Sequence, residues 1–213
     1  MLYVWEYLFM NFKKIGIGLS AVIAVVVIIS FLLPSSWNIE ESITIDAKNS
    51  TVYPLVSNLK LWEKWSPWNK DMDPSAEYRF EGPEQGIGAH QFWDGKKIGK
   101  GNLLITESDE EKGIKYDLFF DNNTPSKGGL LFSKTDKGLE VVWTGSGSFG
   151  TNPLKRYIGL MMDKTITKDF KAGLSNLKSL AESLQAEADK LPPEVLPALE
   201  VAVDSEKPIE QAL

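Results

Sequence analysis

The chain has 213 residues and a net charge of −6, and this length suits one medium-sized domain with a real core plus additional segments. It contains no cysteine and a single histidine, His90, which excludes disulfides, cysteine nucleophiles and metal sites built from several histidines. The negative charge arises from residue 182 onward, where eight acidic residues stand against two lysines. Because no basic patch stands out elsewhere, we expect no nucleic-acid partner, and we expect neither a cofactor nor a metal.

The first element is an apolar run over residues 15–33, IGIGLSAVIAVVVIISFLL, which contains no charged residue. As a helix rising 1.5 Å per residue, a run of this length spans roughly the hydrocarbon core of a bilayer. Lys13 and Lys14 precede it, while Glu40 and Glu41 follow it. The positive-inside bias predicts a cytoplasmic N-terminus over residues 1–14, one membrane-spanning helix, and an extracytoplasmic domain at the cell membrane. A cleaved signal peptide is the alternative, but the run is longer than a usual signal core.

Beyond the apolar run, residues 37–188 show the pattern of a soluble domain. Residues 37–46 alternate apolar and polar side chains, which predicts a strand, and residues 47–58 show the spacing of a short helix. Turn sequences such as WDGKK and DNNTPSKGG then separate six strand-like segments, which favours an antiparallel meander. These segments are 76–82, 88–95, 97–108, 113–121, 128–136 and 138–150.

A long helix is predicted over residues 156–190, because apolar side chains recur on one stripe at helical spacing. The stripe contains Met162, Ile166, Phe170, Leu174, Leu177 and Ala181. A sheet covered by one such helix is an α+β arrangement of two layers. Residues 189–213 read as an acidic and flexible tail, since two consecutive prolines stop the helix.

Three stretches of the sequence carry a resemblance to a known family: LWEKWSPW at 61–68, the glycine-containing strands of 86–120, and GLEVVWTGSG at 138–147. Together they resemble the SRPBCC or START-like superfamily, also described as the polyketide cyclase/dehydrase and lipid transport family. This resemblance implies the helix-grip fold of the birch-pollen allergen, in which a curved antiparallel sheet of about six or seven strands wraps around a long C-terminal helix. It also implies a cavity for a hydrophobic small molecule or lipid between sheet and helix.

Three tryptophans, Trp62, Trp65 and Trp68, lie within seven residues of the segment that closes one end of the cavity in this family. They can seal the core or stack on a ligand, and we favour the core for the cluster with Trp68 nearest the ligand. The residues that we expect to line the cavity are Trp65, Trp68, His90, Phe92, Trp93, Tyr116, Leu118, Val141, Trp143, Met162, Ile166 and Phe170.

The inventory for catalysis is small, and we assign no catalytic residue. His90 titrates in the useful range, but no carboxylate partner follows from its spacing. Three functions therefore stay open: a membrane-anchored domain that binds a hydrophobic molecule or lipid, an enzyme similar to polyketide cyclases and dehydratases, and a domain with a filled core that binds a protein partner. The aromatic content, the expected anchor and the resemblance favour the first.

Overall fold

The computed structural model describes residues 2–120, 125–150 and 152–190, so most of the predicted acidic tail lies outside the described residues. The helices are α1 (Leu2–Leu32), α2 (Asn49–Ser57) and α3 (Arg156–Ala188), with short 3-10 helices η1 (Leu59–Lys64) and η2 (Pro153–Lys155). The strands are β1 (Ser36–Ile45), β2 (Glu77–Glu81), β3 (His90–Gly95), β4 (Gly99–Asp109), β5 (Gly113–Phe120), β6 (Ser126–Thr135) and β7 (Gly138–Ser148).

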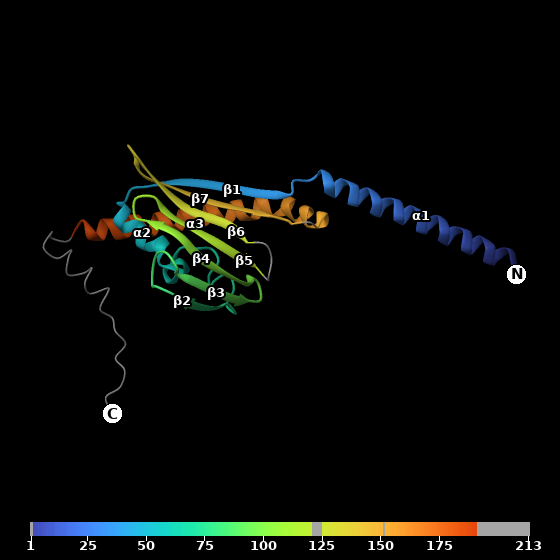
Figure 1. Ribbon diagram of the computed structural model, residues 1–213, viewed down its shortest axis with the longest axis horizontal. Coiled ribbons are helices and arrows are strands. Elements are labelled where there is room, and N and C mark those ends of the chain that lie inside the picture. Colours follow the sequence, from blue (N-terminus) through green and yellow to red (C-terminus); the bar gives the residue numbers. More distant parts are fainter. Residues whose placement is uncertain (1, 121–124, 151, 191–213) are drawn as a thin grey trace, which may run out of the picture.

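The seven strands form one antiparallel sheet in the order β1-β7-β6-β5-β4-β3-β2. Strands β2 to β7 follow one another as a meander, while β1 lies at the far edge beside β7 (Figure 1). Helix α3 runs along one face of this sheet, close to β1 and β7. This arrangement confirms the predicted α+β class and the helix-grip fold.

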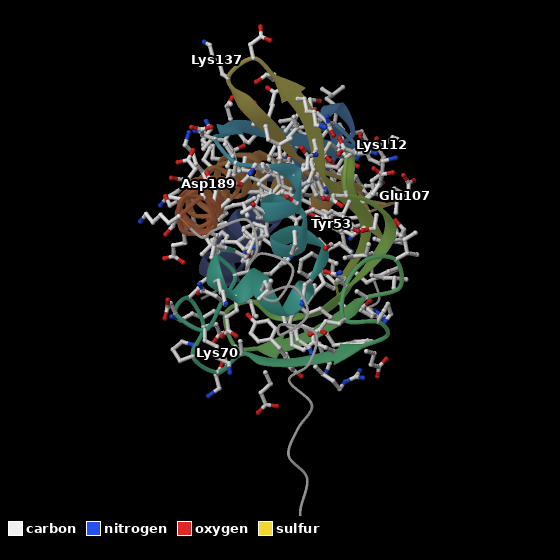
Figure 2. All side chains as sticks on the ribbon, turned by 90° about the vertical axis from the view of Figure 1, so that its left-hand side faces the viewer. Tyr53, Lys70, Glu107, Lys112, Lys137 and Asp189 are labelled. Atoms are coloured by element: carbon white, nitrogen blue, oxygen red, sulfur yellow. The ribbon has the colours of Figure 1, made fainter. Side chains whose placement is uncertain are left out.

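The sheet curves around α3, as the view from the end opposite α1 shows (Figure 2). The labelled charged side chains of Lys70, Lys112 and Lys137 lie at the outer margin in that view. One irregularity in the sheet falls between Ile105 and Glu107, where the register of β4 against β5 shifts. Bulges of this kind increase the local bend and twist of a sheet, and so help it to enclose a helix.

The inner face of the sheet is tightly packed at the end where β1 finishes. Ile45 and Leu139 pair across β1 and β7, and both are buried against Leu174, Leu177 and Ala181 of α3. The predicted helical stripe therefore forms the core at this end. Each fully buried aliphatic side chain contributes about 1.5–3 kcal/mol to folding relative to an exposed one.

Helix α1 extends away from the domain (Figure 1) and is joined to the start of α3 by polar contacts. The Arg156 guanidinium donates to the carbonyl oxygens of Phe31 (3.1 Å) and Leu33 (3.2 Å), and the Tyr157 hydroxyl donates to Val26 O (2.7 Å). The last carbonyls of a helix lack partners within it, so Arg156 caps the C-terminus of α1.

Within the part of the chain that the structure describes, no helix reaches the length and apolarity needed to cross a membrane. The expected membrane span is therefore not supported here and stays a proposal.

Candidate functional site

A cavity of about 350 Å³ lies between the inner face of the sheet and α3, in the half of the domain nearer to α1. Its walls come from β2 to β5, from the segment after α2 that contains η1, and from the first half of α3. Strands β1, β6 and β7 contribute Trp37, Lys127 and Gly145. Trp37, near the start of β1, and Met162, in the second turn of α3, mark the end closest to α1. Met72 and Phe120 line the cavity and are also exposed, so they lie where it opens to the surface.

Seven of the twelve side chains expected at the cavity lie on its wall. These are Trp68, Trp93, Tyr116, Leu118, Met162, Ile166 and Phe170. Tyr116 and Leu118 are two residues apart on β5, so they share its inner face. Ile166 and Phe170 are four residues apart on α3, so they share the face that α3 turns to the sheet.

Three of the expected residues lie in the core instead. Trp65, Val141 and Trp143 have no exposed surface, and none of them reaches the cavity wall. The Trp65 indole donates to Leu55 O (2.9 Å), which fixes the ring inside the core. The Trp143 ring is screened from the cavity because the Phe170 ring stacks on it, with centroids 4.3 Å apart and planes 5° from parallel.

His90 and Phe92 lie on the outer face of the sheet, away from the cavity. Their neighbours Gln91 and Trp93 line the cavity, and successive side chains of a strand point to opposite faces. His90 Nε2 is hydrogen-bonded to Asn102 Oδ1 (2.9 Å). The one histidine is thus placed where it has no access to a ligand in the cavity.

The three tryptophans after α2 divide into two kinds. Trp65 belongs to the core alone. Trp62 is 6% exposed, with its indole donating to Val56 O (2.9 Å), and it also lines the cavity. Trp68 is half-buried and lines the cavity, with its ring 6.1 Å from that of Phe170. Trp68 therefore lies on the cavity wall, while Trp62 belongs to the core and to the wall at once.

Several wall residues were not expected from the sequence. Tyr78 and Phe80 project inward from β2, and Trp37 projects inward from β1. The alternation of charged Glu77 and Arg79 with these aromatic residues is the signal that marks Tyr78 and Phe80 as inward-facing. On α3, Asp169 also lines the cavity.

Glycines on the inner face give the aromatic rings of the wall the space that they occupy. A Cβ added at Gly101 would overlap the Trp93 ring, and one at Gly128 would overlap the Tyr116 ring. The rings therefore lie flat against the sheet instead of filling the space in front of it. This leaves room between sheet and helix that larger residues at these positions would remove.

Polar groups are few on this wall, and burial shifts several of their pKa values. Burial raises the pKa of Asp169, and the charge of Lys168 acts in the opposite direction. The pKa of Tyr78 is raised by burial first and then by the charges of Glu63 and Asp73. Burial also raises the pKa of Tyr116 to about 12. Both phenols therefore stay protonated at neutral pH.

Comparison with known sequences decides the family. Residues 36–182, well over half of the chain, match the family described as polyketide cyclase / dehydrase and lipid transport. The chain belongs to this family. The matched range runs from the start of β1 into the last turns of α3, so the family covers all seven strands and most of α3. The predicted membership of the SRPBCC superfamily is confirmed.

Solved structures agree on the fold. The domain is similar to a protein of unknown function, SA2116, from Staphylococcus aureus, with 11% identity over 70% of this chain and 94% of that one (TM-score 0.52). It is similar to the KanY protein, with 12% identity over 70% and 99% (TM-score 0.51), and to Aha1 from Colwellia psychrerythraea, with 15% identity over 68% and 96% (TM-score 0.50). At these identities the likeness shows the fold alone. A search of curated proteins finds no match.

Proposed function

We propose that the protein binds a hydrophobic small molecule or lipid in the cavity between its sheet and α3. The observation that carries this proposal is the cavity itself, whose wall is mostly apolar and includes several aromatic rings. A volume of about 350 Å³ lies at the small end of the range of roughly 300–1,000 Å³ for small-molecule sites. We therefore expect one compact apolar molecule, or a single acyl chain, as the ligand.

The aromatic residues favour a ligand with a flat or extended apolar surface. Trp68 and Trp93 line the cavity while remaining half-buried, so a ligand can cover ring surface that is otherwise exposed to solvent. Burying such surface stabilises a complex by about 25 cal/mol per Å² of apolar area.

The alternative functions are less well supported. A domain with a filled core would leave no space of this volume between α3 and the sheet. An acid–base role for His90 in an enzyme has no geometric support, because its ring lies on the other face of the sheet and bonds to Asn102.

The binding proposal is tested on the full chain in lipid nanodiscs with a fluorescent hydrophobic probe, aminoanthracene. The variant Ile166→Trp adds bulk to the cavity wall, while Lys168→Trp adds the same ring to an exposed position of α3 that does not line the cavity. We expect Ile166→Trp to weaken binding at least tenfold and Lys168→Trp to leave it unchanged. Equal binding by both variants and the wild type would place the probe outside the cavity.

We also propose that α1 anchors this domain in the cell membrane, with the N-terminus in the cytoplasm. The support is the uncharged run over residues 15–33 and the exposure of its side chains: Ile17 is 70% exposed and Leu32 is 80% exposed. An apolar surface of this extent on a single helix is unfavourable in water and favourable in lipid.

Expression of the full chain in a bacterial host tests the anchor. The wild type should stay in the membrane fraction after alkaline carbonate washing, and added protease should digest the domain only when it reaches the extracytoplasmic side. A variant with Val22→Lys and Val26→Lys should be released by the wash, since lysine at the centre of a span costs about 2.5–3.5 kcal/mol. Release of the wild type would exclude the anchor.

A further inference from the structure

Tyr116 is a deeply buried polar side chain of the cavity wall, with 5% of its surface exposed. It stands on the inner face of β5, and its hydroxyl oxygen accepts a hydrogen bond from the Trp143 indole Nε1 (2.9 Å). Trp143 is itself held by the stacked ring of Phe170 and by the edge of the Trp65 ring, 5.3 Å away. The position of the Tyr116 hydroxyl is therefore fixed from the core side.

The hydrogen of this hydroxyl has no acceptor among the residues that the structure describes. The indole N–H of Trp143 is a donor only, so it occupies a lone pair of the Tyr116 oxygen and leaves the O–H unused. A buried donor without an acceptor costs free energy, and buried polar groups in native proteins are almost always paired. The unused donor belongs to a residue of the cavity wall, so a bound molecule can supply the acceptor.

The sheet beside this hydroxyl supports the same role. Gly128 lies next to the Tyr116 ring, and a Cβ at this position would overlap the ring atoms that carry the hydroxyl. The glycine thus lets the ring lie against β6, with its hydroxyl between Gly128 and the Trp143 indole. The Trp62 ring also packs against the Tyr116 ring in an edge-to-face arrangement, with centroids 5.7 Å apart.

We propose that the Tyr116 hydroxyl donates a hydrogen bond to an uncharged oxygen on the ligand, such as that of a ketone, an ester or an alcohol. This inference rests on the proposed binding function and narrows its ligand class to apolar molecules with an oxygen acceptor at one position. A ligand carboxylate is disfavoured at this buried hydroxyl, because burying a charge without a paired cation is costly. The cations of the cavity wall, Lys97 and Lys127, are exposed side chains, whereas Tyr116 is 5% exposed. The raised pKa of Tyr116 agrees with a hydroxyl that keeps its proton and acts as a donor.

Tyr78 provides a natural contrast on the same wall. It also lines the cavity, but its hydroxyl donates to the carbonyl oxygen of Trp68 (3.1 Å). Its hydrogen is therefore already used within the protein. Tyr78→Phe removes a hydroxyl that already donates within the protein, whereas Tyr116→Phe removes one whose hydrogen has no acceptor among the described residues. The two substitutions remove the same volume.

The test uses two probes of nearly equal shape, acetylnaphthalene and isopropenylnaphthalene. The first has a ketone oxygen where the second has a methylene group. Binding to the full chain in nanodiscs is measured for the wild type, Tyr116→Phe and Tyr78→Phe. We expect the wild type to prefer the ketone by between about twofold and tenfold, the range of one net hydrogen bond. Tyr116→Phe should abolish this preference, whereas Tyr78→Phe should keep the same ratio between the two probes.

The carbonyl stretch of the bound ketone gives a second measurement that loss of packing would not reproduce. Its infrared frequency should be lower in the wild type than in Tyr116→Phe, because a donated hydrogen bond weakens the C=O bond. Equal affinities for both probes in all three proteins, with an unshifted carbonyl, would overturn the role of Tyr116 and leave the binding function intact. Absence of binding by either probe to the wild type would overturn both.

Discussion

The rings of Trp143 and Phe170 lie parallel with their centroids 4.3 Å apart, and this stacked pair separates the packed core from the cavity. Trp143 is fully buried on β7, while Phe170 of α3 is 4% exposed and forms part of the cavity wall. The stacked pair therefore contributes to the stability of the fold and also shapes the cavity.

Phe170→Ala should destabilise the protein by about 3–5 kcal/mol, since it removes a buried ring and leaves a void that joins the cavity. Chemical denaturation of the full chain in detergent measures this change. Phe119→Ala is the control, because Phe119 is half-buried on the outer face of β5 and should cost clearly less. If the two variants lose the same free energy of unfolding, the stacked pair contributes no more to stability than a half-buried ring on the outer face.

The sequence was sufficient to predict the strand order along the chain and the stripe of α3, because alternation and helical spacing are local properties. It did not reveal where that stripe changes from core to cavity wall. The change falls at Phe170, and it depends on which residues of the sheet stand opposite, among them Gly145. Such pairings across the fold are not contained in any one segment.

The sequence also did not reveal which residues of β3 face the cavity. Phe92 and Trp93 were both expected at the cavity, although neighbours on a strand cannot share a face. Only contact with β2 and β4 decides that Gln91 and Trp93 point inward while His90 and Phe92 point outward. An aromatic residue on an outer face, such as Phe92 beneath Arg79, carries no sign of its side in the sequence.

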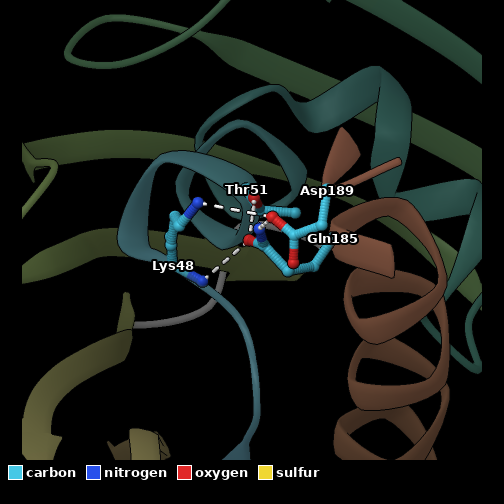
Figure 3. A network of polar contacts seen from close by, with 4 residues as sticks. All are labelled: Lys48, Thr51, Gln185 and Asp189. Atoms are coloured by element: carbon cyan, nitrogen blue, oxygen red, sulfur yellow. Dashed lines mark hydrogen bonds and ion pairs between the residues drawn. The ribbon is translucent and has the colours of Figure 1, made fainter. Parts of the chain in front are cut away.

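Gln185 of α3 holds the beginning of α2 in place of a cap from α2 itself (Figure 3). Its Oε1 accepts from the Lys48 amide (3.0 Å) and from the Thr51 hydroxyl (2.7 Å), and its Nε2 donates to Asp189 Oδ1 (2.9 Å). Gln185→Ala should destabilise the protein by about 1–3 kcal/mol, because it leaves partly buried donors unpaired.

Lys48→Ala is the matched control for this network. The Lys48 ammonium lies 3.5 Å from Asp189, but both side chains are largely exposed. An exposed ion pair contributes about 0–1 kcal/mol, so this variant should change the denaturation midpoint little. A larger loss in Lys48→Ala than in Gln185→Ala would show that the ion pair, and not the amide, holds the two helices.

Asp73 should make the protein sensitive to acid. Its carboxylate accepts from the hydroxyl of Ser75 (2.6 Å) and from the amides of Lys97 (2.6 Å) and Ile98 (3.1 Å). These hydrogen bonds, that of the Ser75 hydroxyl first, hold the pKa of Asp73 well below its usual range. Through them the residue ties the cavity wall around Met72 to the turn between β3 and β4.

Because the folded state lowers this pKa, the carboxylate contributes its full stability above the ordinary value of about 4, and this contribution is lost as the pH falls further. Denaturation curves recorded from pH 6 down to pH 2 should show this loss in the wild type. Asp73→Asn cannot titrate at this position. Its free energy of unfolding should be lower than that of the wild type at pH 6 and should fall less steeply below pH 4. Parallel curves for the two proteins would mean that other carboxyl groups cause the acid sensitivity.

Arg156 should fix the direction in which α1 leaves the domain, because its guanidinium serves carbonyls that the end of α1 leaves without partners. The chain contains no cysteine, so spin labels can be attached through Leu19→Cys and Lys168→Cys without further changes. Pulsed electron resonance on the labelled chain in nanodiscs should give a narrow distance distribution for the wild type and a broader one for Arg156→Gln. Lys164→Ala removes a charge from an exposed position of α3 and should leave the distribution narrow. If Arg156→Gln does not broaden the distance distribution, the linker after α1, and not this side chain, sets the angle between α1 and the domain.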